Sequence, residues 1–129
     1  MPSAADAPAR PDTSIPRPPI ESLRRAADFD ALSRRGSARR HRLFTVRVRR
    51  NGLGRVRCGF AVSRRVGGAV VRNRVRRRLR ALMRATPPEG GFDVLISAHP
   101  RIVDASFEEL RAAIDELVTE ALDRTDERQ

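Results

Sequence analysis

The chain contains one cysteine, no tryptophan, no tyrosine and, among its 27 basic residues, no lysine. A single thiol, Cys58, excludes an internal disulfide and a cysteine-based zinc site. No apolar run approaches the roughly 18 residues of a membrane span. The first residues also lack the basic stretch and apolar segment of a secretory signal. We therefore expect a soluble, cytoplasmic protein without a membrane partner.

Acidic residues are absent from the middle of the chain. Residues 34–84 contain 19 arginines and no aspartate or glutamate, whereas residues 101–129 contain four arginines and nine acids. A surface adapted only for solubility mixes both signs, and a block of one sign repels itself unless a partner neutralises it. Nucleotide bias in a G+C-rich genome explains arginine in place of lysine, but it does not explain the loss of every acid. The segment therefore indicates a phosphate-rich partner.

The 129 residues suffice for one domain. Residues 1–20 hold six of the nine prolines and few large apolar side chains, so we expect a disordered N-terminal segment. Residues 21–122 have the hydrophobic pattern of a single globular domain, and a domain of this size can bury about two-thirds of its unfolded surface. Residues 123–129 are expected to form a polar tail.

Hydrophobic periodicity predicts six elements in the domain. They are a helix at 21–35 that ends at Gly36, strands at 43–49 and 56–62, a helix at 69–84, a central strand at 92–98, and a helix up to about residue 122 that Ser106 and Glu109 cap. The Asn51-Gly52 pair between the first two strands is typical of a hairpin. The predicted fold is an α+β sandwich of order α-β-β-α-β-α, or α-β-β-(β)-α-β-α if one strand is broken in two. Its helices are expected on one face of a small mixed sheet.

The two predicted hairpin strands alternate in polarity, with large apolar side chains on one face. The other face carries Thr45, Arg47, Arg49, Arg57, Gly59 and Ala61. Because side chains alternate along a strand, we expect these residues to share an outer face that forms the floor of a groove with positive walls. Phe29 stays open between two roles, a core side chain or a stacking surface for an unpaired base.

The predicted helix at 69–84 is the most basic element. Its apolar stripe is narrow, about 80° wide, and consists of Val71, Val75, Leu79 and Leu82. The remaining surface carries Arg72, Asn73, Arg74, Arg76, Arg77, Arg78, Arg80 and Arg84. An ordinary solvated helix would carry glutamates one turn away from such arginines, and this helix has none. The Gly67-Gly68 pair before it fits either a phosphate-binding helix start or a flexible connector.

Residues suited to catalysis are scarce. His41 and His99 lie 58 positions apart, and neither has a carboxylate beside it in the sequence. Asp93 is the one acid placed where a site could form, and Cys58 alternates with core residues as a small buried side chain does. No nucleophile, base and orienting group come together. The sequence therefore predicts no catalytic and no metal-binding residue in this chain.

The longest motif runs from Arg57 to Arg77 and reads RCGFAVSRRVGGAVVRNRVRR. Its Arg72-Asn73-Arg74 box lies eight residues beyond the basic pair that begins at Arg64, and Leu23-Arg24-Arg25 and Asp28-Phe29 stand upstream. This pattern closely resembles the signature of the bacterial ribonuclease P protein subunit. The resemblance covers about 100 of the 129 residues, since the order of elements agrees to about Leu122.

The resemblance implies an RNA-based endoribonuclease that removes the 5′ leader of precursor tRNA, with its catalytic centre in a large RNA subunit that uses Mg²⁺. The partners would be that catalytic RNA and precursor tRNA, and no DNA. The RNA subunit would contact Arg64, Arg65, Arg72, Asn73, Arg74, Arg76 and Arg77. A cleft for the single-stranded leader would be lined by Phe29, Thr45, Arg47, Arg57, Ala61 and Arg72. The family's fold also has a left-handed β-α-β crossover around the basic helix, against the general preference for right-handed ones.

Two positions depart from the family's pattern. Members often carry a second aromatic four residues after the one at Phe29, where this chain has Ser33, and an aromatic is also common where Arg47 stands. We therefore expect weaker stacking on the bases of the leader and stronger electrostatic contacts with its phosphate backbone. Two other functions stay open from the residues alone. One is a structural RNA-binding protein such as a ribosomal component, and the other is a protein-only nuclease that uses His41 or Asp93.

Overall fold

The computed structural model describes residues 21–23, 26–35, 37–85 and 90–127. The disordered segment expected at residues 1–20 and the helix stop expected at Gly36 lie outside these ranges. Within them, no helix combines the length and the apolar character that crossing a membrane requires.

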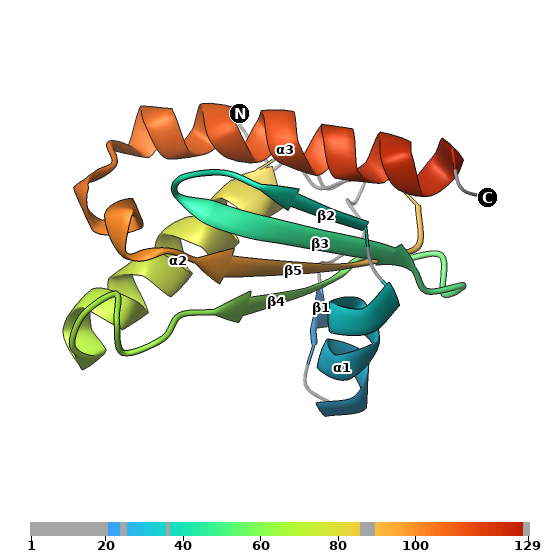
Figure 1. Ribbon diagram of the computed structural model, residues 1–129, viewed down its shortest axis with the longest axis horizontal. Helices are drawn as coiled ribbons and strands as arrows, with labels where there is room; N and C mark the ends of the chain where they lie inside the picture. Colours follow the sequence, from blue (N-terminus) through green and yellow to red (C-terminus); the bar gives the residue numbers. More distant parts are fainter. Residues whose placement is uncertain (1–20, 24–25, 36, 86–89, 128–129) are drawn as a thin grey trace, which may run out of the picture.

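Five strands and three α-helices are present among the described residues (Figure 1). In chain order the elements are β1 (Glu21–Ser22), α1 (Ala26–Arg35), β2 (Ser37–Arg40), β3 (Phe44–Arg50), β4 (Arg57–Ala61), α2 (Ala69–Ala85), β5 (Phe92–Ala98), the short 3-10 helix η2 (Pro100–Asp104) and α3 (Phe107–Glu127). The predicted cap of the last helix is confirmed. The Glu109 N–H donates to Ser106 Oγ at 3.0 Å, and the Ser106 N–H donates to Glu109 Oε1 at 3.1 Å.

The sheet has the strand order β1-β4-β5-β3-β2. β5 is central, as its continuous apolar run predicts, and it pairs antiparallel with β3 and parallel with β4. The chain passes from β4 to β5 through α2, which lies behind the sheet in Figure 1. This crossover is therefore left-handed, as the resemblance implies.

The prediction that β3 and β4 form a hairpin is wrong, because β5 lies between these two strands. A turn does form at residues 51–54, where Gly52 and Gly54 have φ values of 71° and 73°. It is anchored on the segment leading into β5, since the Asn51 N–H donates to the Gly91 carbonyl at 3.0 Å. The Asn-Gly signal reports a local turn, and it carries no information about a strand that arrives from later in the chain.

Two strands have no counterpart in the prediction. β2, with the sequence SARR, lacks apolar alternation, and it forms the hairpin that is present by pairing antiparallel with β3. β1 occupies the start of the predicted first helix, because the Glu21 N–H donates to the Val56 carbonyl at 3.1 Å and ties this segment to β4. At the other end of the chain, α3 continues to Glu127, into the segment expected to be a polar tail.

The core has two parts, one on each face of the sheet. α2 and α3 pack on one face, against the apolar side chains of β3, β4 and β5. On the other face lies α1, with a small cluster of Leu23, Leu32 and Leu95 and with Phe29 partly buried beside it. The expectation that all helices lie on one face is therefore wrong for α1. Leu95 explains the difference, because it gives the second face of β5 an apolar side chain for α1 to cover.

Gly59 allows α1 to approach the sheet. A Cβ at this position would lie 2.9 Å from Phe29 Cε1 and 3.2 Å from Leu23 Cβ. We therefore expect Gly59→Ala to displace α1 and to lower the free energy of unfolding by about 1–3 kcal/mol, the usual cost of overpacking. Urea denaturation measures this loss. Gly68→Ala is the matched control, because nothing lies within 4 Å of a Cβ there, and an equal effect of both substitutions would contradict the close approach.

Candidate nucleic-acid interface

Three rows of side chains cross the outer face, which is the sheet face opposite α2 and α3. Strand pairing places Thr45, Ser97 and Ala61 in the first row, Arg47, Leu95 and Gly59 in the middle row, and Arg49, Asp93 and Arg57 in the third row. The residues expected to share this face therefore do share it. Alternation alone predicted the face, although β3 and β4 are not neighbours.

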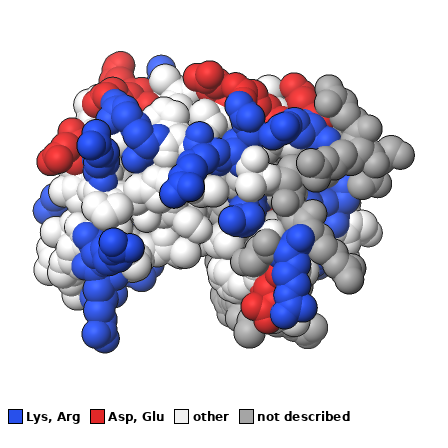
Figure 2. Space-filling model, viewed as in Figure 1, with Lys and Arg blue, Asp and Glu red and all other residues white. Residues whose placement is uncertain are grey.

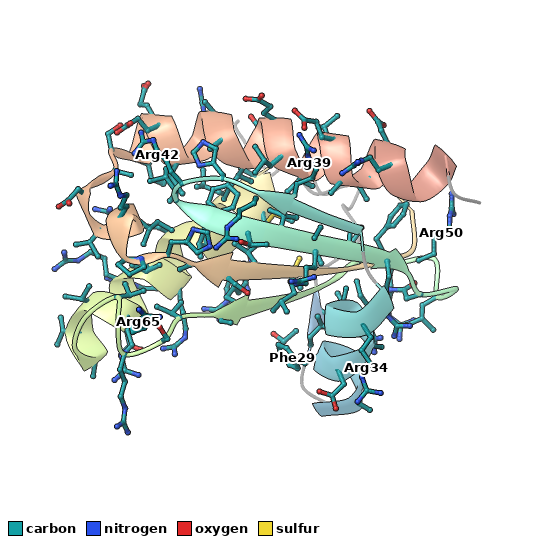
Figure 3. The ribbon with its side chains drawn as sticks, viewed as in Figure 1. Phe29, Arg34, Arg39, Arg42, Arg50 and Arg65 are labelled. Carbon is teal, nitrogen blue, oxygen red and sulfur yellow. The ribbon has the colours of Figure 1, made fainter. Side chains whose placement is uncertain are left out.

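α1 lies over the middle row. Phe29 packs against Gly59, and Leu32 packs in one cluster with Leu95. The first row stays uncovered, with Ala61 exposed and Thr45 half-buried. In Figure 3, Phe29 lies on the side of α1 toward this uncovered end of the sheet. Phe29 thus packs on the sheet and keeps a partly exposed side chain at the border of the first row.

The third row is held together by Asp93, which is 0% exposed. Its Oδ1 accepts hydrogen bonds from Arg57 Nε at 2.8 Å and from Asn51 Nδ2 at 2.9 Å. Its Oδ2 accepts from Arg57 Nη2 at 2.7 Å and from Arg49 Nη2 at 3.3 Å. One carboxylate therefore joins three strands and the turn after β3, and it partners two arginines.

These contacts set the charge state of Asp93. Burial by itself raises the pKa of a carboxyl group, but the hydrogen bonds from Arg57 and Asn51 and the charges of Arg57 and Arg49 outweigh it. The pKa of Asp93 is therefore held below its usual value, and the group is ionised at neutral pH. For Cys58 nearby, burial and the charge of Asp93 raise the thiol pKa to about 12, so this side chain is neutral.

The residues that the resemblance assigns to the leader cleft divide among the rows. Thr45 and Ala61 come together in the uncovered first row, and Arg47 stands in the middle row. Arg57 lies in the third row, where two of its nitrogens bind Asp93. Ser97 also belongs to the first row, but it is not among the predicted residues because residues 92–98 form one apolar run in the sequence. Alternation along β5 was the signal that could have found it.

α2 presents the basic surface that its sequence predicts. Val75, Leu79, Leu82 and Met83 are buried, and Val71 is partly buried against the same core. The opposite side of the helix forms a shallow groove of about 530 Å³ lined by Val70, Asn73, Arg76, Arg77 and Arg80. Arg76 donates to Asn73 Oδ1 at 3.1 Å, and the Arg80 guanidinium lies 5.8 Å from the centre of the Phe60 ring. Two of the lining arginines are thereby fixed in position.

The turn before α2 adds two exposed arginines. Arg64 and Arg65 lie on its surface, and Val66 anchors the turn in the core. The Val66 N–H donates to the Ser63 carbonyl at 3.1 Å, which closes the turn. Figure 3 shows Arg65 projecting away from the sheet at the opposite side of the uncovered row from Phe29. The turn and α1 therefore flank the first row.

Intramolecular acids neutralise only part of the basic segment. Arg39 pairs with Glu120 and Arg42 with Glu109, both on α3. Arg55 pairs with Glu21, while Arg49 and Arg57 share Asp93. Among the described residues, the arginines from 64 to 80 pair with no acid. The unneutralised charge is thus concentrated on α2 and the turn before it.

The surface shows the same division (Figure 2). Acidic side chains lie along the edge formed by α3, and arginines occupy much of the face below it. The lower outline is notched between α1 and the lobe that carries the turn before α2. This notch opens onto the end of the sheet where the first row lies, so a strand of nucleic acid has a concave, basic site to enter.

Most of the chain matches the model of a known protein family. The family model described as Ribonuclease P matches residues 18–122. A ribonuclease P protein component of Acidothermus cellulolyticus is 41% identical over 100 residues, covering 74% of this chain and 83% of that protein. One of Chloroflexus aurantiacus is 46% identical over 69 residues, covering 51% of each chain, so this match spans about half the length of that relative.

Solved structures agree with the fold. The ribonuclease P protein of Thermotoga maritima superposes with a TM-score of 0.67 at 28% identity, covering 75% of this chain and 94% of that one. The Staphylococcus aureus protein superposes with a TM-score of 0.73, covering 80% of this chain and 96% of that one. Its identity is 22%, so this second likeness is one of fold.

We expect Asp93→Asn to lower the free energy of unfolding by about 3 kcal/mol at pH 7, because two arginines lose a buried partner. Since the folded-state pKa of Asp93 is lowered, its stabilising effect is present above the unfolded pKa of about 3.9 and is lost as pH falls through the folded value. The difference between wild type and variant should therefore shrink in acid. Urea denaturation at pH 7 and below pH 4 measures it.

The exposed Asp104 supplies the control for this experiment. Asp104→Asn should leave the free energy of unfolding within about 0.5 kcal/mol of wild type, as substitutions at exposed sites usually do. A gap between wild type and Asp93→Asn that stays constant from pH 7 into acid would contradict an ionised, stabilising Asp93.

Proposed function

Because this chain belongs to the ribonuclease P protein family, we propose that it is the protein subunit of a ribonuclease P. In that role it binds a catalytic RNA and the 5′ leader of precursor tRNA and assists the endonucleolytic removal of the leader. The observation that carries the proposal is an unneutralised arginine surface at residues 64–80 next to an uncovered polar row of the sheet. The named relatives favour this function over that of a ribosomal protein. We place the complex in the cytoplasm.

The surface for the RNA subunit consists of α2 and the turn before it. Its proposed contacts are Arg64, Arg65, Arg72, Asn73, Arg74, Arg76 and Arg77. Arginine suits this role because its planar group binds phosphate through two hydrogen bonds and stacks on bases. Contacts to about 6–10 phosphates would make affinity fall roughly 10³- to 10⁵-fold between 50 and 200 mM salt.

The leader would lie along the first row, between α1 and the turn before α2. Thr45 and Ala61 line its floor, with Arg47 in the adjoining row and Phe29 at the border. Arg72 contributes from α2, where it is half-buried. Arg57 acts through Asp93 as part of the sheet's support, because that carboxylate occupies its Nε and Nη2. Leader binding by this chain therefore depends on electrostatic contacts with the phosphate backbone of the RNA more than on stacking of its bases.

The residues of this chain do not fit a Mg²⁺ site. Magnesium prefers carboxylate oxygens, yet in the described ranges no three histidines, cysteines, aspartates or glutamates gather closely enough to hold a metal ion. Asp93 lies on the outer face, but its two oxygens accept four hydrogen bonds from Arg49, Asn51 and Arg57. We propose that the RNA subunit holds the metal and that this chain supplies no catalytic group.

Arg72→Ala and Arg74→Ala should each weaken binding of the RNA subunit. Each loses about one phosphate contact, so we expect roughly 10-fold lower affinity and a salt slope smaller by about 1. Filter binding across a salt series measures both quantities. Arg111→Ala is the matched control, since it removes an exposed arginine from the acidic helix α3. Equal losses for all three variants would contradict the placement of the interface on α2.

Arg47→Ala should weaken binding of leader-bearing precursor tRNA and leave binding of mature tRNA nearly unchanged. We expect roughly a 10-fold loss, because one charge-assisted hydrogen bond contributes about 1.5 kcal/mol. Equilibrium binding of the two RNAs to the reconstituted holoenzyme measures the difference. A loss of the same size on both RNAs would place Arg47 outside the leader cleft.

A further inference from the structure

The outer face extends one residue beyond β5, past the first row. Asp93, Leu95 and Ser97 point to this face, and His99 follows in the same alternation. Its backbone is fixed on both sides, because the His99 N–H donates to the Leu43 carbonyl at 2.9 Å and its carbonyl accepts from the Ile102 N–H at 3.0 Å. His99 is thus presented from a rigid position next to the first row.

The His99 ring is fixed as well. Its Nε2 lies 2.9 Å from Thr45 Oγ1, and both residues are half-buried. The side chain makes no capping hydrogen bond to η2, although His99 stands at its N-terminal end. Within the part of the chain that the structure describes, Thr45 is the one hydrogen-bonding partner of this imidazole. Its second nitrogen, Nδ1, is therefore left for a group that enters the cleft.

The other histidine is engaged differently. His41 stacks on Phe44 with ring centres 5.4 Å apart, and its Nδ1 accepts the Leu43 N–H at 3.1 Å. It therefore supports the β2–β3 hairpin from within. The contrast matters because the chain has two histidines in all, and one of them serves as a natural control for the other.

We propose that His99, oriented by Thr45, binds a phosphodiester group of the precursor-tRNA leader, and this inference rests on the proposed function. When Thr45 donates its hydroxyl proton to Nε2, Nδ1 carries the ring's proton and can donate it to a phosphate oxygen. In the protonated ring both nitrogens donate and the ring carries a positive charge. Histidine is the side chain whose charge commonly changes between pH 5 and 8, so leader affinity should rise as pH falls.

The charged groups on the adjoining elements favour an anion at this position. Arg40 stands opposite Thr45 on β2, Arg47 lies two residues further along β3, and Arg101 follows on η2. The acids on the same elements are Asp104 on η2 and Asp93 in the third row, where Arg57 already binds the carboxylate. Cations therefore outnumber acids on the elements next to His99, which favours the approach of a phosphate.

The experiment compares two variants in the holoenzyme, built from the full chain and its cognate RNA subunit. Equilibrium affinity is measured for precursor tRNA with a blocked scissile bond and for mature tRNA, from pH 5.5 to 7.5. The ratio of the two affinities is the leader's contribution. For wild type we expect this ratio to rise roughly 3- to 10-fold toward pH 5.5, as a charge-assisted contact forms.

His99→Gln should abolish most of that rise, because glutamine can still bond Thr45 but cannot gain a charge. His41→Gln should keep it. A His99→Gln holoenzyme that retains the wild-type rise would overturn the inference and leave the proposed function standing. A wild-type holoenzyme without any preference for leader-bearing RNA would overturn both. Thr45→Val tests the orienting bond, and a full pH-dependent rise in that variant would count against the role of Thr45.

Discussion

The buried carboxylate of Asp93 is the contact on which the sheet depends. A segment of 51 residues with 19 arginines and no acid repels itself. Two of those arginines lie in the same row of the sheet, on the two strands that flank β5. Asp93 lies beyond that segment in sequence, and β5 carries it between β3 and β4. The insertion of β5 therefore supplies the central strand and the counter-charge together.

The same principle decides which arginines remain for a partner. Glu21, Glu109 and Glu120 also lie outside the acid-free segment, and they pair with arginines of the β2–β3 hairpin and of the turn after β3. Among the described residues, the arginines from 64 to 80, on α2 and the preceding turn, receive no such partner. The fold thus neutralises charge within the sheet and leaves the arginines from 64 to 80 on the surface beside a row that α1 does not cover.

Local patterns in the sequence predict which face of a strand or helix a side chain occupies. They do not predict which strands lie next to one another in the sheet. Alternation placed Thr45 and Ala61 on one face, and helical periodicity found the buried stripe of α2. The Asn51-Gly52 turn suggested a pairing of β3 with β4 that β5 prevents, because insertion of a later strand leaves no local signal. β2 was missed for lack of alternation. The side-chain contacts of Asp93 and His99 join residues far apart in sequence, so only the pairing of strands reveals these contacts.

We propose that this chain is a docking surface for RNA and that the RNA breaks the phosphodiester bond. Cleavage of precursor tRNA at low Mg²⁺ by the purified protein, by the cognate ribonuclease P RNA and by the two together tests this proposal. Neither component alone should release the leader efficiently, whereas the mixture should release it. Release of the leader by the protein without RNA, abolished by substitution of His41 or Asp93, would contradict it.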